Sequence, residues 1–173
     1  MEQIPVISLN LGGIETNPGF KIDLNLLLRA AVGAVFGDIF MRCVYRMRPY
    51  EATPGSVDAV HRKWLKVVQD FVSAKHVNLL KFNGLCRKII EDFDRIPLLD
   101  IKKPRVGIVG EILVKFSPAG NNHLVELLEA EGAEAVVPDL LDFFNYSVYG
   151  LQYRHEYLGM SKTTDILSKA AIK

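Results

Sequence analysis

Cysteine is scarce in this chain of 173 residues, which contains two, Cys43 and Cys86. They lie far apart, and neither has a second cysteine or a histidine at the spacing of metal ligands. The sequence therefore indicates neither a disulfide framework nor a zinc module. An iron–sulfur cluster normally takes several cysteine thiolates, so this chain alone has too few of them to hold one.

An excess of charge of one sign is also missing. Lysine and arginine together number 21 and aspartate and glutamate 20, which gives no reason to expect nucleic acid or an anionic membrane as a partner. The chain has no positively charged start followed by an apolar run, and no uninterrupted apolar stretch approaches the length of a membrane span. We therefore expect a cytoplasmic protein with no membrane contact.

The chain does contain enough apolar sequence for one good core, since 49% of its residues are hydrophobic. The clearest pattern spans Arg105–Phe144. Its opening run, Val106–Val109, is short, β-branched and without alternation, which predicts a parallel strand covered on both faces. A helix ending at Gly132 and a second strand at Ala135–Val137 complete a predicted βαβ unit. The apolar residues that share one face of this helix are Leu124, Val125, Leu127 and Leu128.

Three helices are predicted between a first strand at Ile4–Leu9 and this unit. The longest has apolar residues at helical spacing from Leu24 to Met47, and Gly33 and Gly37 within it predict a closely packed neighbour. Cys43 lies on its apolar stripe, which is typical of a small core thiol. The second helix, with Ser56 as its predicted N-cap, and the third, from about Val77 to Arg95, follow.

The predicted fold class is therefore α/β: a small parallel, Rossmann-like sheet with a helical segment between the first strand and the central βαβ unit. The length of the chain fits one domain, or one domain plus part of another. We expect residues 1–100 to hold the end of one α/β lobe and a helical connection, and residues 101–173 to start a second lobe followed by C-terminal helices.

Ligands of open α/β sheets usually sit beyond the carboxyl ends of the strands. Here that edge is the loop Gly110–Asn122, with Glu111 and Lys115 beside Ser117–His123. The loop either binds an anion or a cofactor edge, or it caps its own helix through Asn121 or Asn122.

A second candidate site follows the long helix. Arg46, Arg48, Tyr50 and Glu51 lie close together in sequence, and two arginines beside a tyrosine suit a carboxylate or a phosphate. The same residues also suit an internal Arg–Glu pair that holds the loop.

Two further patterns remain open. Glu111 and His123 are a possible general acid–base pair if their side chains meet. The aromatic residues after Asp139 either line a ligand groove or form a helix face that packs on the sheet or on a partner: Phe143, Phe144, Tyr146, Tyr149, Tyr153 and Tyr157. A final amphipathic segment is predicted at Ser161–Lys173.

Three stretches resemble a known family: VISLNLGGIETNPGF, then MRCVYRMRPYE with TPGS shortly after it, and above all RVGIVGEILVKFSPAGNNHLVELLEAEGAEAVVPDLLDFF. From about Ile4 to Tyr149 the chain is similar to the C-terminal, dehydratase-like region of activator-related proteins of the 2-hydroxyacyl-CoA (2-hydroxyglutaryl-CoA) dehydratase group. The resemblance implies a full-length protein that uses ATP and iron–sulfur clusters for low-potential electron transfer. It implies no catalytic residue in this chain, because neither Cys43 nor Cys86 matches a cluster motif.

The expected function is therefore that of a non-catalytic fragment, a scaffold or docking domain for iron–sulfur electron transfer. Its implied partners are the activase and dehydratase-like regions missing from this chain, and unpaired strand edges make a homo-oligomer another possibility. The alternative is a free-standing α/β domain that binds a small molecule, an acyl-CoA or an anion. The candidate binding residues are Gly110, Glu111, Lys115, Asn121, Asn122, Arg46, Arg48 and Tyr50.

Overall fold

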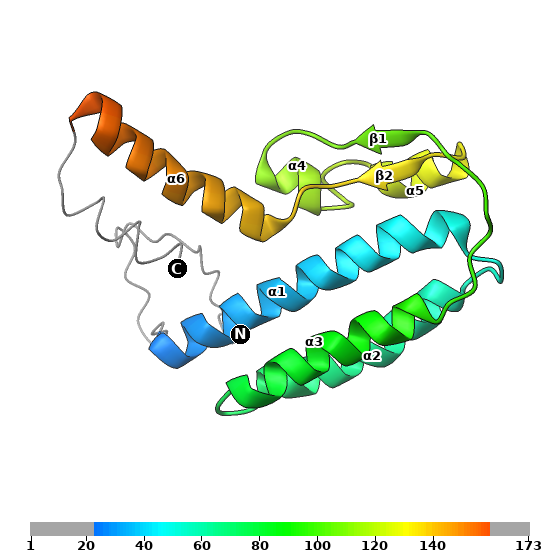
Figure 1. Cartoon of the computed structure of the whole chain (residues 1–173), viewed down its shortest axis with the longest axis horizontal. Helices are drawn as coiled ribbons and strands as arrows, with labels where there is room; N and C mark the ends of the chain where they lie inside the picture. Colours follow the sequence, from blue (N-terminus) through cyan, green and yellow to red (C-terminus); the bar gives the residue numbers. More distant parts are fainter. Residues whose placement is uncertain (1–22, 160–173) are drawn as a thin grey trace, which may run out of the picture.

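The computed structural model describes residues 23–159, which begin with a bundle of three helices (Figure 1). These are α1 (Leu24–Met47), α2 (Ser56–Ser73) and α3 (Leu79–Asp94), each where helical periodicity predicts it. Their apolar faces enclose one core. Its fully buried side chains are Phe36, Val57, Ile89 and Phe93.

The ends of α1 follow from its flanking residues. Asp23 caps the start, as its Oδ1 accepts a hydrogen bond from the N–H of Leu26 at 2.6 Å. Beyond Met47 the chain makes one 3-10 turn, η1 (Arg48–Tyr50). Arg48 itself keeps helical angles, φ −55° and ψ −40°. The helix therefore ends because Pro49 has no N–H to donate, and not because the residue before it leaves the helical region.

The two glycines of α1 do not mark a close contact, so that prediction is wrong. A Cβ atom added at Gly33 or Gly37 would meet no atom within 4 Å. The segment Leu24–Tyr50 is long and apolar enough to span a membrane by length and composition alone, although charged residues such as Arg29, Asp38 and Arg42 interrupt it. A core helix meets the same two criteria, and one face of α1 is the centre of the bundle core.

The second half is a βαβ unit that lies along α1. Strands β1 (Arg105–Gly107) and β2 (Glu134–Val136) are parallel, and helices α4 (Ile112–Phe116) and α5 (Leu124–Ala130) connect them. The two parallel strands and the helix that ends at Gly132 are as predicted, whereas α4 lies within the segment Gly110–Asn122 that was predicted to be a loop. Gly132 ends α5 with φ +84°; its own N–H donates to the carbonyl oxygen of Glu129 and the N–H of Ala133 donates to that of Leu128.

The burial of the first strand is not as predicted. All three residues of β1 are exposed, whereas Glu134 and Ala135 of β2 are buried. One face of the pair covers a small core with α5, in which Ile108, Val125, Ala135 and Val137 are buried. The outer side of β1 has no covering element within residues 23–159, because the described part of the sheet has two strands. The predicted strand at Ile4–Leu9 lies outside the described residues.

The last described helix, α6 (Leu140–Leu158), extends away from the sheet (Figure 1). Most of its aromatic side chains are exposed, with Tyr146, Tyr153 and Tyr157 each more than half so. Phe143, near its start, packs edge-on against Phe144. The segment predicted at Ser161–Lys173 lies outside the described residues. The described protein is thus mixed α/β but mainly helical.

Candidate functional site

The loop after β1 is held by its own side chains. Glu111 Oε1 accepts a hydrogen bond from the N–H of Val114 at 2.8 Å, which caps α4. Gly110, just before it, has φ +137°, a region that glycine enters at little cost. One first-turn N–H of α4, that of Val114, is therefore already bonded to Glu111.

Asn121 links the two short helices of this loop. Its Nδ2 donates to the carbonyl oxygen of Val114 at 2.9 Å, and its Oδ1 accepts from the N–H of Leu124 at 3.1 Å. Asn122 and His123 follow with φ +55° each, in the left-handed region. The structure thus shows Asn121 in the capping role, while binding of an anion by this loop stays a prediction.

Two further side chains of the loop, those of Lys115 and His123, have other neighbours. The Lys115 ammonium lies 5.5 Å from the ring centre of Phe116 and 5.9 Å from that of Phe143, within cation–π range. His123 Nδ1 lies 3.6 Å from Glu126 Oε1. The carboxylate of Glu111 is instead directed to Val114, so the structure brings no Glu111–His123 hydrogen bond.

Arg48 joins the bundle to the sheet half. Its Nε and Nη2 donate to the two carboxylate oxygens of Glu129 at 2.8 and 3.1 Å, and its Nη1 donates to Asp58 at 3.3 Å. Burial taken alone would lower the pKa of the Arg48 guanidinium, but the hydrogen bonds and charges of Glu129 and Asp58 together outweigh it and raise that pKa. Arg48 is therefore held by an internal ion pair, with Glu129 rather than Glu51 as its partner.

Tyr50 and Glu51 also make internal contacts. Tyr50 Oη donates to Glu134 at 2.8 Å, and Arg105 donates to the same carboxylate at 3.0 Å. Glu51 accepts from the N–H groups of residues 55 and 57, so it caps α2 in place of the predicted Ser56. Burial would raise the pKa of Glu51, but these hydrogen bonds outweigh burial and lower it.

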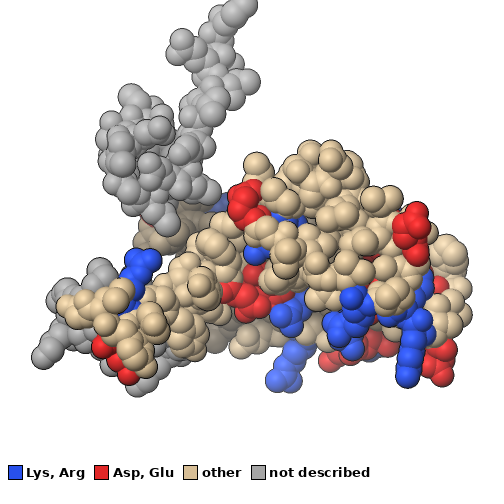
Figure 2. Space-filling view, turned by 90° about the horizontal axis from the view of Figure 1, so that it is seen from above, with Lys and Arg blue, Asp and Glu red and all other residues tan. Residues whose placement is uncertain are grey.

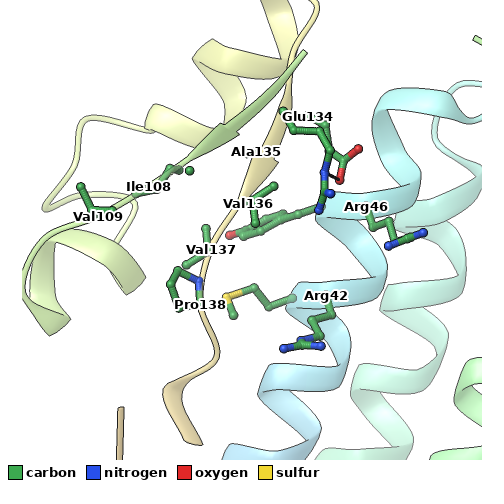
Figure 3. Close-up of a pocket in the computed structure, with 13 residues that line it drawn as sticks. Arg42, Arg46, Ile108, Val109, Glu134, Ala135, Val136, Val137 and Pro138 are labelled. Carbon is green, nitrogen blue, oxygen red and sulfur yellow. Dashed lines mark hydrogen bonds and ion pairs between the residues drawn. The ribbon is translucent and has the colours of Figure 1, made fainter. Parts of the chain in front are cut away.

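Arg46 is the member of this group that faces open space. It is exposed and lines a cavity between α1 and the two strands (Figure 3). No carboxylate within residues 23–159 forms an ion pair with it. Of the candidate binding residues around η1, Arg46 is thus the one that remains available to a ligand.

The two cysteines are on the bundle helices and half-buried, as the core interpretation of Cys43 predicts. Burial raises the pKa of the Cys43 thiol to about 11, and the nearby charge of Asp94 acts in the same direction. Burial also raises the pKa of Cys86. Within the described residues no group of three or more histidine, cysteine, aspartate or glutamate side chains is placed to hold a metal ion.

One polar residue that matters was missed by sequence reasoning. Asp38 of α1 is 7% exposed, and its two carboxylate oxygens accept hydrogen bonds from the N–H groups of Leu140 and Leu141 at 2.8 and 3.0 Å. It therefore caps α6 from another helix. Arg42, one turn further along α1, donates to Asp139 at 2.7 Å. A lone aspartate within an apolar helix stripe is the sequence signal that could have pointed to a buried partner.

Comparison with known proteins adds no assignment. The chain matches no protein-family model, no curated protein and no solved structure. The resemblance to the dehydratase-activator group therefore rests on the three sequence stretches alone.

Proposed function

We propose that the chain is a docking and scaffold module of an ATP-dependent activator or reductase related to the 2-hydroxyacyl-CoA dehydratases. The sequence resemblance from about Ile4 to Tyr149 supports the family. The unpaired outer edge of β1 is the observation that supports docking.

The hydrogen bonds between the strands identify that edge. The N–H of Glu134 donates to Pro104 O at 2.8 Å, and the N–H of Ile108 donates to Val136 O at 2.9 Å. Backbone groups that face one neighbour alternate along a parallel strand, so those of Arg105, Gly107 and Val109 point away from β2. Within residues 23–159 these outward groups have no hydrogen-bonded partner strand.

The surface around the edge suits a protein partner. Val109 is 81% exposed and Leu113 64%, and Val106 is also exposed. Figure 2, which looks onto the side where β1 and α4 lie in Figure 1, shows a largely uncharged surface with most charged side chains along one border. Parallel sheets are normally covered on both faces and extended by further strands, so an open edge with apolar surroundings supports attachment of another strand.

The partner that fits is the dehydratase-like region implied by the resemblance, because it is itself α/β and offers parallel strands. In this proposal ATP and the iron–sulfur cluster belong to the partner regions. The present chain fixes the geometry between them, and Cys43 and Cys86 stay in the bundle core as packing residues.

The test introduces a charge at the β1 edge, in the whole protein that the gene encodes. Val109→Asp should lower the rate of ATP-dependent electron transfer at least tenfold, because a carboxylate at the docked edge loses its water. Leu80→Asp is the matched control, since Leu80 is 94% exposed and belongs to α3, a helix that α1 separates from β1 in Figure 1.

Two outcomes separate the parts of the proposal. Equal rates for both variants and the wild-type protein would refute docking at β1. A protein that shows no ATP-dependent electron transfer at all would refute the family assignment, even if Val109→Asp weakened an association.

A further inference from the structure

The cavity beside Arg46 lies between the C-terminal half of α1 and the strands (Figure 3). Its volume is about 350 Å³, within the range of small-molecule sites. Side chains alternate along a strand, and Ile108, Ala135 and Val137 face α5. Val136 therefore belongs to the opposite face, and residues of both faces line the cavity. Arg105, Gly107 and Val109 of the β1 edge are among the lining residues, so the cavity adjoins that edge, whereas no residue of the loop Gly110–Asn122 lines it.

The inner surface of the cavity is mainly apolar. Met41 and Tyr45, one turn apart on α1, line it and also pack against the small core beneath the sheet. Val136 and Pro138 line the side that β2 contributes (Figure 3). Burial raises the pKa of the Tyr45 phenol, so this side chain is uncharged at neutral pH. The surface thus suits an aromatic or aliphatic body.

The charges of the cavity are mainly positive. Its lining contains three arginines and one carboxylate, which gives a formal charge of +2. Two of the arginines have acidic partners: Arg105 pairs with Glu134 at 3.0 Å, and Arg42 pairs with Asp139 at 2.7 Å. Arg46, one turn after Arg42 on the same helix, is the remaining cation and has no acidic partner within residues 23–159.

We infer that this cavity binds a small amphipathic anion, with the apolar body against Met41, Tyr45 and Val136 and the anionic group on Arg46. In Figure 3 the Arg46 side chain extends from α1 away from the strands, so binding requires it to turn toward the cavity, where a guanidinium offers directed hydrogen bonds to a carboxylate, sulfonate or phosphate. The Arg42–Asp139 and Arg105–Glu134 pairs hold the adjacent walls in place. Neither pair has to break when the ligand enters.

The probe for this site is 8-anilinonaphthalene-1-sulfonate, which combines an aromatic body with one negative charge and fluoresces when it leaves water. The wild-type chain should bind it at one site. Arg46→Ala should weaken binding about tenfold, the effect of one charge-assisted hydrogen bond. Arg46→Lys should retain most of the affinity, because it keeps the charge. Arg62→Ala, at an exposed arginine of α2 outside the cavity, should bind as the wild type does.

Two comparisons make the inference refutable. The uncharged analogue N-phenyl-1-naphthylamine should bind the wild type and Arg46→Ala equally, since it has no group for Arg46. Leu113→Asp, which changes the exposed apolar surface but not the cavity, should leave sulfonate binding unchanged. Unchanged sulfonate affinity in Arg46→Ala, or its loss in Leu113→Asp, would place the probe on the general apolar surface and overturn the inference. Neither result depends on the electron-transfer assay of the docking proposal.

Discussion

The hydrogen bonds that the Asp38 carboxylate accepts should supply much of the free energy that holds the start of α6 on α1. It accepts hydrogen bonds from two backbone N–H groups, those of Leu140 and Leu141, in a site where its side chain is 7% exposed. A capping hydrogen bond contributes about 1 kcal/mol. Asp38→Ala removes both acceptors, so it should lower the free energy of local opening at the start of α6 by about 2 kcal/mol. Asp38→Asn keeps one acceptor oxygen and should lose about 1 kcal/mol.

Native-state hydrogen exchange measures this directly. The amides of Leu140 and Leu141 should exchange about 30 times faster in Asp38→Ala than in the wild type, since 1.4 kcal/mol is a factor of ten. Asp70→Ala, at an exposed aspartate of α2, is the matched control and should leave both rates unchanged. If the two amides exchange equally fast in the wild type and in Asp38→Ala, Asp38 does not cap α6 and the argument fails.

Three further predictions concern the bundle. Gly33→Ala and Gly37→Ala should each raise the free energy of unfolding by about 0.5–1 kcal/mol, because alanine favours a helix and the added methyl meets nothing; a loss of stability in urea titrations would contradict this. Hydrogen bonds from Lys63 and then from the Trp64 indole lower the pKa of Asp92, so the unfolded chain binds more protons and stability falls as the pH drops from the ordinary aspartate pKa through the lower folded value. Acid unfolding followed by the fluorescence of Trp64 should lose this component in Asp92→Asn, and an identical acid transition in that variant would be evidence against it. With a pKa of about 11, the Cys43 thiol should be about 0.1% thiolate at pH 8 and react with iodoacetamide far more slowly than a free cysteine; equal rates would show that it is not buried.

Sequence reasoning predicted what depends on near neighbours in the chain. Helical spacing located α1, α2 and α3, and an apolar run, a polar loop and Gly132 located the βαβ unit. The capping of α1 by Asp23 was also predictable, because the donor lies three residues away. In each of these cases the local conformational preference and the final structure agree.

The errors concern partners that are distant in sequence. Asp38 bonds to residues 102 and 103 positions later, and Arg48 pairs with Glu129, 81 positions away. No local pattern identifies such partners. The predicted burial of β1 failed for the same reason, since the composition of a strand does not say which elements will cover it.

The outcome at the candidate sites also depends on whether a residue's partner is near or distant in sequence. Glu111 and Asn121 were selected because their loop follows a strand, and both turn out to bond to backbone groups a few residues away. Arg46 and Arg48 looked equivalent in sequence. They differ because Arg48 turns toward Glu129, whereas Arg46 lies on the side of α1 that borders the cavity.

Helix α1 is the element common to both cores, and Tyr45 on it packs against each of them. A division of the protein after residue 100 would therefore separate the strands from the helix on which they rest. Met41 and Tyr45 would leave with the bundle, and residues 101–159 on their own would lack one wall of their apolar interior. The helical and sheet-containing halves should accordingly unfold in a single cooperative step, with α1 as the shared support.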